Sequence, residues 1–182
     1  IRDAGKATNF ELRQGLSLKE AEESVRYLWK ELDVRRKIAE KRSGGPKIGF
    51  IEGPPTMNGE PHIGHIRGRM LTDLWYRLET MKGYDVMFRA GWDTQGLPVE
   101  LQAERELGLM GSKVENLKKL GEEKLVEACK RIIHKYNEKW VEADDLLGIL
   151  FDYDKAYWTY KDEYIEREWK ILEAGWKRGL LV

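Results

Sequence analysis

The chain has 182 residues, enough for one domain or for one domain with a helical appendage, and its 41% hydrophobic content is ordinary for a soluble globular protein. Its 32 basic and 32 acidic residues cancel, which excludes a global electrostatic attraction to nucleic acid or acidic membranes. The single cysteine, Cys129, excludes an internal disulfide framework, and no apolar run of about 18 residues could span a membrane, so we expect a cytoplasmic protein.

The first 45 residues predict a polar lead-in followed by one helix. Residues 1–16 lack an initiator Met and an apolar leader, which indicates a trimmed chain. Ser17 and Glu20 form a capping-box pair, and apolar residues then recur at three- and four-residue spacing up to a breaker at 43–46 (SGGP). We assign residues 1–45 to an amino-terminal helical extension.

The next segment predicts a strand, a loop, a helix and a second strand. Residues 47–52 (KIGFIE) are short and apolar, whereas 53–61 (GPPTMNGEP) contain three prolines and Asn-Gly and cannot be regular. From His62 to about Met81 the pattern is helical, and 84–90 (YDVMFRA) are typical of a strand. This order is a βαβ unit, and therefore half of a parallel α/β sheet.

Beyond Pro98 the chain is predicted to be mostly helical. Ser112 and Glu115 form a second capping box, after which apolar residues recur every three to five positions as far as 140. A last helix is predicted over about residues 162–178, with Gly179 as its carboxy-terminal cap.

Two of the three histidines, His62 and His65, stand at the start of the helix that follows the proline-rich loop. A helix N-terminus presents unpaired N–H groups and about half a positive charge, which suits a phosphate. Gly64 removes a side chain where a phosphate or a flat base would approach. Because the histidines are three apart, both project from the same side of the first turn and can favour charge that develops in a transition state.

Simpler interpretations of these residues stay open at this point. Two histidines at this spacing are more often surface or packed residues, and two ligands are too few for a metal site, so we predict no metal site. Asp93 could be an N-cap ahead of the next helix. We expect Trp92 to be a core residue, and His134, in a charged mid-helix stretch, to be structural.

Two blocks carry a family resemblance. Residues 53–65 (GPPTMNGEPHIGH) resemble the HIGH-motif region of class I aminoacyl-tRNA synthetases, and 91–100 (GWDTQGLPVE) resemble the second block of their isoleucine branch. Leucyl relatives usually have FDAFG in the second block and valyl relatives DHAG. The second block more commonly has His where Gln95 stands, and because Gln cannot carry a proton we assign Gln95 no acid–base role. The resemblance extends more loosely over nearly the whole chain.

The resemblance implies that residues 46–182 are the first half of a Rossmann-like α/β catalytic domain with helical segments on either side, ending before an editing insertion. ATP, accompanied by Mg²⁺, and isoleucine would react there to an adenylate, which is then transferred to isoleucine tRNA. His62 and His65 would be the catalytic groups on the phosphates, and Gly64 would lie against the adenosine. The amino acid would be bound by Gly53, Pro54 and Asp93.

The same resemblance predicts what this sequence does not contain. It has no KMSKS-like lysine loop, editing insertion or anticodon-binding helices, so we expect the isolated chain to be nearly inactive and tRNA to contact other parts of the parent protein. One alternative is a nucleotidyltransferase of the same superfamily, which shares the HxGH turn but does not account for 91–93. Another is a synthetase-derived binding module without activity.

Overall fold

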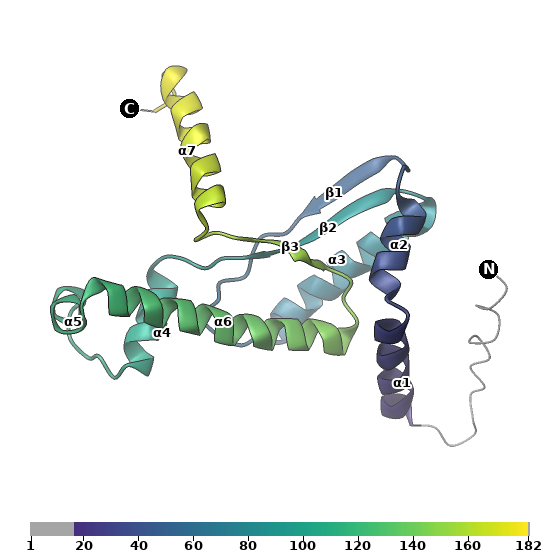
Figure 1. Cartoon of the computed structure of the whole chain (residues 1–182), viewed down its shortest axis with the longest axis horizontal. Coiled ribbons are helices and arrows are strands. Elements are labelled where there is room, and N and C mark those ends of the chain that lie inside the picture. Colours follow the sequence, from purple (N-terminus) through teal and green to yellow (C-terminus); the bar gives the residue numbers. More distant parts are fainter. Residues whose placement is uncertain (1–16, 182) are drawn as a thin grey trace.

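The computed structural model describes residues 17–181. The predicted lead-in over 1–16 lies outside the described residues. A parallel sheet in the order β1-β2-β3 is formed by β1 (Lys47–Ile51), β2 (Asp85–Trp92) and β3 (Asp152–Trp158) (Figure 1). Helix α3 (Ile63–Lys82) connects the first two strands. The second connection contains α4 (Leu97–Glu106), α5 (Lys113–Leu120) and α6 (Glu122–Leu147). The predicted βαβ unit and the α/β fold class are confirmed.

The amino-terminal segment forms two helices, α1 (Leu18–Glu31) and α2 (Val34–Arg42), where the pattern predicted one. The capping box is confirmed, because the Glu20 N–H donates to the Ser17 hydroxyl at 3.2 Å. The helix breaks at Asp33, which has a φ of 46° and pairs with Arg36 at 2.6 Å. Asp is among the few residues that tolerate this left-handed conformation, and apolar spacing does not reveal it.

Strand β3 was not predicted within the mostly helical carboxy-terminal part. It pairs with β2 at Gly91–Tyr157 and Trp92–Trp158. The Tyr157 ring lies directly over Gly91, where a Cβ atom would come within 2.2 Å of the ring. Only glycine therefore permits this approach of the two strands. The last helix, α7 (Asp162–Lys177), is confirmed, and Gly179 follows it at a φ of 67°.

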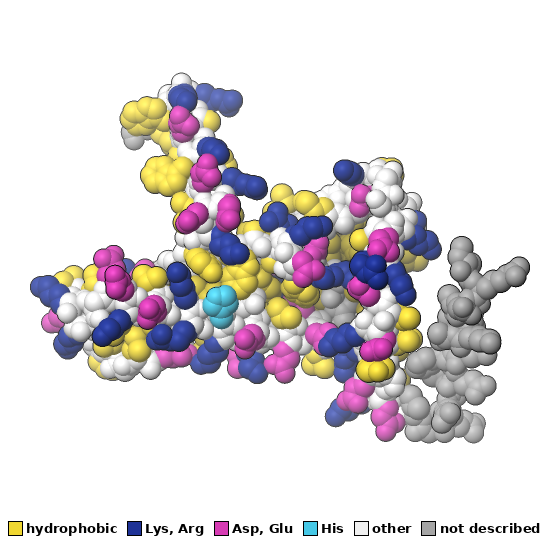
Figure 2. All heavy atoms as spheres, in the orientation of Figure 1, with side chains coloured by type: hydrophobic (Ala, Val, Ile, Leu, Met, Phe, Trp, Pro, Cys, Tyr) yellow, Lys and Arg dark blue, Asp and Glu magenta, His cyan; other side chains and the backbone are white. Residues whose placement is uncertain are grey.

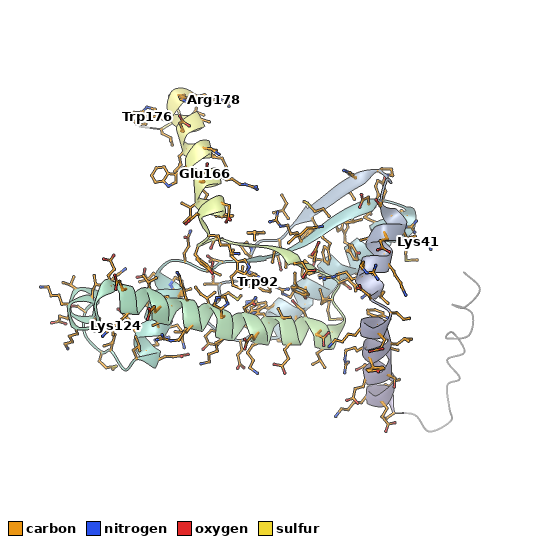
Figure 3. All side chains as sticks on the ribbon, viewed as in Figure 1. Lys41, Trp92, Lys124, Glu166, Trp176 and Arg178 are labelled. Atoms are coloured by element: carbon orange, nitrogen blue, oxygen red, sulfur yellow. The ribbon has the colours of Figure 1, made fainter. Side chains whose placement is uncertain are left out.

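The main core lies between the sheet and the helices α3 and α6. The Phe88 ring stacks on Tyr76 of α3 and on Phe151, with ring centroids 4.5 and 4.2 Å apart. Trp92 is 1% exposed, as expected for a core residue, and lies between the sheet and α6 (Figure 3). This packing fixes the positions of the strand ends and of the α3 N-terminus.

Helix α3 buries its polar side, contrary to what its apolar spacing suggests. Arg69 and Asp73 are buried, whereas Met70, Leu74 and Leu78 are 49–63% exposed. The pattern located the helix but not the face that packs on the sheet. Among residues 17–181, no helix combines the length and apolar character needed to cross a membrane.

Candidate active site

The carboxyl ends of the three parallel strands meet at one edge of the sheet, where α/β proteins bind their ligands. Glu52 follows β1, Asp93 follows β2 and Thr159 follows β3. The loop after β1 crosses this edge, and its Thr56 forms an isolated parallel bridge with Asp93. The fold therefore brings the proline-rich loop and Asp93 together, as the sequence predicted.

Asp93 is fixed by the loop on one side and by β3 on the other. Its carboxylate accepts hydrogen bonds from the Thr56 hydroxyl at 2.8 Å and the Thr159 hydroxyl at 3.4 Å. Its backbone N–H donates to the Pro55 carbonyl at 3.0 Å. Both side-chain partners are neutral hydroxyls, so they orient the carboxylate without cancelling its charge. The N-cap interpretation of Asp93 is wrong, because Gly96 occupies that position of α4.

Gly53 and Pro54 precede the residue that pairs with Asp93, so both lie at the same sheet edge. Gly53 is exposed and Pro54 is partly buried. A cavity of about 650 Å³ begins one residue after Asp93: it is lined by Thr94, Gln95 and Gly96, together with residues of α4, α6 and the start of α7, and not by Gly53 or Pro54. That volume suits a small molecule.

The two histidines form a reciprocal cap on α3. His62 is the N-cap residue, and its Nδ1 accepts a hydrogen bond from the Gly64 N–H at 3.1 Å. The Nδ1 of His65 accepts from the His62 N–H at 3.3 Å, and the two rings stack with centroids 3.7 Å apart. Because both Nδ1 atoms accept, each neutral ring carries its proton on Nε2 and keeps that N–H available as a donor.

The conformation of the histidine turn itself favours glycine at position 64. A Cβ atom at this position would lie 3.0 Å from Cε1 and 3.1 Å from Nδ1 of His62, so a side chain would press on the capping ring. Burial lowers the pKa of His65, and the nearby His62 and Arg69 lower it further. The turn therefore favours a neutral donor at His65.

A buried charged cluster beneath this turn was missed by the sequence analysis. The Arg69 guanidinium lies 2.5 Å from the Asp144 carboxylate and 3.3 Å from that of Glu52. The Tyr153 hydroxyl donates to Asp144 at 3.0 Å. Burial raises the pKa of Glu52 to about 7 and that of Asp144 to about 6, although Arg69 opposes both shifts. The available signal was that Arg69 and Asp73 share one side of a helix whose apolar residues lie elsewhere.

His134 is exposed on α6, with its ring centroid 5.4 Å from that of Trp158. Over residues 17–181 no three His, Cys, Asp or Glu side chains gather where they could hold a metal ion.

The chain matches a known protein family and several of its members. Residues 24–182 match the model of the tRNA synthetases class I (I, L, M and V). The chain is 42% identical over 160 residues to an isoleucine–tRNA ligase of Clostridium novyi (strain NT), covering 88% of this chain and 15% of that protein. The isoleucine–tRNA ligase of Thermus thermophilus is 41% identical over 160 residues, with the same coverage of 88% and 15%.

The fold also matches a solved structure. A LeuRS chain of Agrobacterium radiobacter K84, in a ternary complex with tRNA and LeuAMS, superposes with a TM-score of 0.62 at 22% sequence identity. The match covers 87% of this chain and 18% of that chain. This sequence therefore spans less than a fifth of the length of these relatives.

Proposed function

This chain belongs to the class I tRNA synthetases of the isoleucine, leucine, methionine and valine group, and we propose that it carries the first half of the active site of an isoleucine–tRNA ligase. In this reaction isoleucine and ATP give isoleucyl-adenylate and pyrophosphate, and the isoleucyl group then passes to isoleucine tRNA. A nucleotidyltransferase of the same superfamily does not account for a family match over residues 24–182.

The observation that carries the proposal is the Asp93 carboxylate beside the proline-rich loop. It is held by two neutral hydroxyls, so its charge is available to a cation such as the ammonium of an amino acid. In the proposed site Asp93 and the Pro54 carbonyl hold this ammonium, and Gly53 lines the floor. Isoleucine is favoured over leucine, methionine or valine by the second block and by isoleucine–tRNA ligases that are 41–42% identical to the chain over 160 aligned residues.

The histidine turn serves the phosphates of ATP in this proposal. The amino-acid carboxylate attacks the α-phosphorus, the bond to pyrophosphate breaks, and negative charge grows on the phosphate oxygens. The Nε2–H groups of His62 and His65 donate to those oxygens, while Gly64 lies against the adenosine. Donors that are already oriented before the reaction stabilise such charge effectively, and removing one typically costs about 10²–10³ in rate. Mg²⁺ accompanying ATP as part of the substrate would supply further screening of the phosphate charge.

Isoleucine-dependent ATP–pyrophosphate exchange by the full-length protein tests the proposal. Exchange is expected to be fastest with isoleucine, slower with valine, and slowest with leucine. Exchange that is fastest with leucine would overturn the isoleucine assignment. No exchange with any of the three would favour a binding module derived from a synthetase. The proposed enzyme acts in the cytoplasm, where its tRNA is found.

A further inference from the structure

Trp140 of α6 links the two parts of the site. This residue is 2% exposed, and its indole N–H donates to the Gly59 carbonyl of the proline-rich loop at 2.9 Å. Its ring lies against the imidazole of His65, with centroids 4.8 Å apart and planes inclined by 48°. One side chain from a distant part of the sequence therefore contacts both the loop and the histidine turn.

The helix that carries Trp140 is linked to α3 by an ion pair and by a cation–π contact. Asp144, one turn beyond Trp140, pairs with Arg69, which is one turn beyond His65. The Arg69 guanidinium also lies over the Trp140 ring, 4.8 Å from its centroid. His65 and Arg69 of α3 thus face Trp140 and Asp144 of α6. Both helices lie on the same side of the sheet (Figure 1).

Within the turn, the orientation of the His65 ring is only weakly restrained. Its bond from the His62 N–H is 3.3 Å long, which is longer than the usual 2.9–3.0 Å and correspondingly weak. Apart from Trp140, the one aromatic ring among residues 17–181 that packs on His65 is that of His62, which itself accepts a hydrogen bond from the Gly64 N–H. An indole ring fixed by its own hydrogen bond limits the orientations open to His65.

We propose that Trp140 is a positioning residue for the adenylation reaction, holding the His65 ring so that its Nε2–H can donate to a phosphate of ATP. This inference rests on the proposed function. Trp140 does not touch the reacting atoms and acts through His65. Its effect should therefore appear in kcat and should depend on the presence of His65.

A double-mutant cycle on the full-length protein tests this dependence, with ATP–pyrophosphate exchange in isoleucine as the readout. Trp140→Leu is expected to lower kcat about 10–100-fold, since small misplacements of a catalytic group have effects of this size. In a His65→Ala background the same change should lower kcat by less than about 3-fold, because coupled residues are not additive. Trp140→Phe keeps a ring against His65 but loses the N–H that donates to Gly59, and is expected to recover part of the lost kcat.

Trp75→Leu provides the matched control. Trp75 is a partly buried tryptophan that packs against the main core, with its ring centroid 5.8 Å from that of Phe50, and lies ten residues along α3 from His65. Its replacement should lower the melting temperature and leave kcat nearly unchanged. If Trp140→Leu does not fold, Trp140→Met fills more of the same space and takes its place in the cycle.

The outcomes separate the inference from the function on which it rests. Equal losses of kcat from the Trp140 change in the presence and absence of His65 would overturn the inference alone. So would a Trp140→Phe variant as impaired as the leucine variant, or a kcat loss of the same size in the control. No isoleucine-dependent exchange by the unmodified protein would overturn the proposed function and the inference together.

Discussion

The hydroxyls of Thr56 and Thr159 hold the Asp93 carboxylate in one orientation while leaving its charge for a ligand. Asp93→Asn keeps the shape of the side chain and removes the charge. We expect it to raise the KM for isoleucine about 10–100-fold, since a hydrogen bond to a charged group contributes about 1.5–3 kcal/mol. The KM for ATP should change little. Exchange kinetics of the full-length protein measure both constants, and equal losses for the two ligands would contradict the role of Asp93 in binding the ammonium.

The buried Glu52 carboxyl makes the free energy of unfolding depend on pH. Burial raises the pKa of this carboxyl to about 7 from an ordinary value of 4.5. Between these values the folded chain holds a proton that the unfolded chain has lost, so the free energy of unfolding falls as the pH rises. The slope from this group is at most about 1.4 kcal/mol per pH unit.

The Glu52→Gln variant of the 182-residue chain isolates this contribution. Glutamine resembles the protonated carboxyl at every pH, so the variant should lose less stability than the natural chain between pH 5 and 8. Urea unfolding at several pH values measures the difference, and Asp144 is present in both proteins. Identical pH profiles would show that Glu52 keeps an ordinary pKa.

Residues at the ends of strands could be predicted because they follow strongly patterned segments. Asp93 comes directly after the apolar strand β2, and the His62–His65 turn follows β1 across the proline-rich loop, at the start of α3. The cluster of Arg69, Glu52 and Asp144 could not be predicted in the same way. Burying a charge is favourable only when its partner arrives from elsewhere in the fold, and Asp144 lies 75 residues from Arg69.

At the level of elements, the unpredicted strand β3 depends on contacts that its own residues do not reveal. Residues 152–158 (DYDKAYW) carry three charges, and the strand pairs with β2 across an irregularity between Arg89 and Gly91. A strand of this kind is stabilised by its neighbour more than by an intrinsic pattern. The left-handed Asp33 that separates α1 from α2 was missed for a similar reason, because hydrophobic spacing carries no information on φ.

The close approach of Tyr157 to Gly91 makes the β2–β3 pairing sensitive to one methyl group. Gly91→Ala is expected to destabilise the chain by about 1–3 kcal/mol, the usual effect of overpacking. Gly49→Ala is the matched control, since the one close neighbour of a Cβ atom there is the flexible end of Met87, at 3.1 Å, and its other neighbours lie at 3.8 Å or beyond. Urea unfolding of the two variants measures the effect, and equal stabilities would show that Tyr157 moves away without cost.

The whole molecule leaves two apolar surfaces without a partner among the described residues. Met70, Leu74 and Leu78 lie on the outer side of α3, and α7 projects from the body with Trp169 and Trp176 more than 60% exposed. Figure 2 shows hydrophobic side chains along α7, and Figure 3 shows Trp176 near its outer end. Exposed apolar groups of this extent are typical of surfaces that contact further protein. The relatives, of which this chain covers about 15%, contain such further protein.

We therefore expect the isolated 182-residue chain to bind ATP weakly and to charge isoleucine tRNA slowly or not at all. It presents the phosphate donors of one turn and the amino-acid carboxylate of one strand end, whereas stabilising the transition state requires groups on all sides of the reacting phosphate. Parallel assays of the isolated chain and the full-length protein, at equal concentrations of active protein, ATP and tRNA, measure the difference. An Asp93→Asn variant of the full-length protein shows how a damaged but complete site behaves. Charging by the isolated chain at a rate near that of the full-length protein would contradict the idea that these residues form only half of the site.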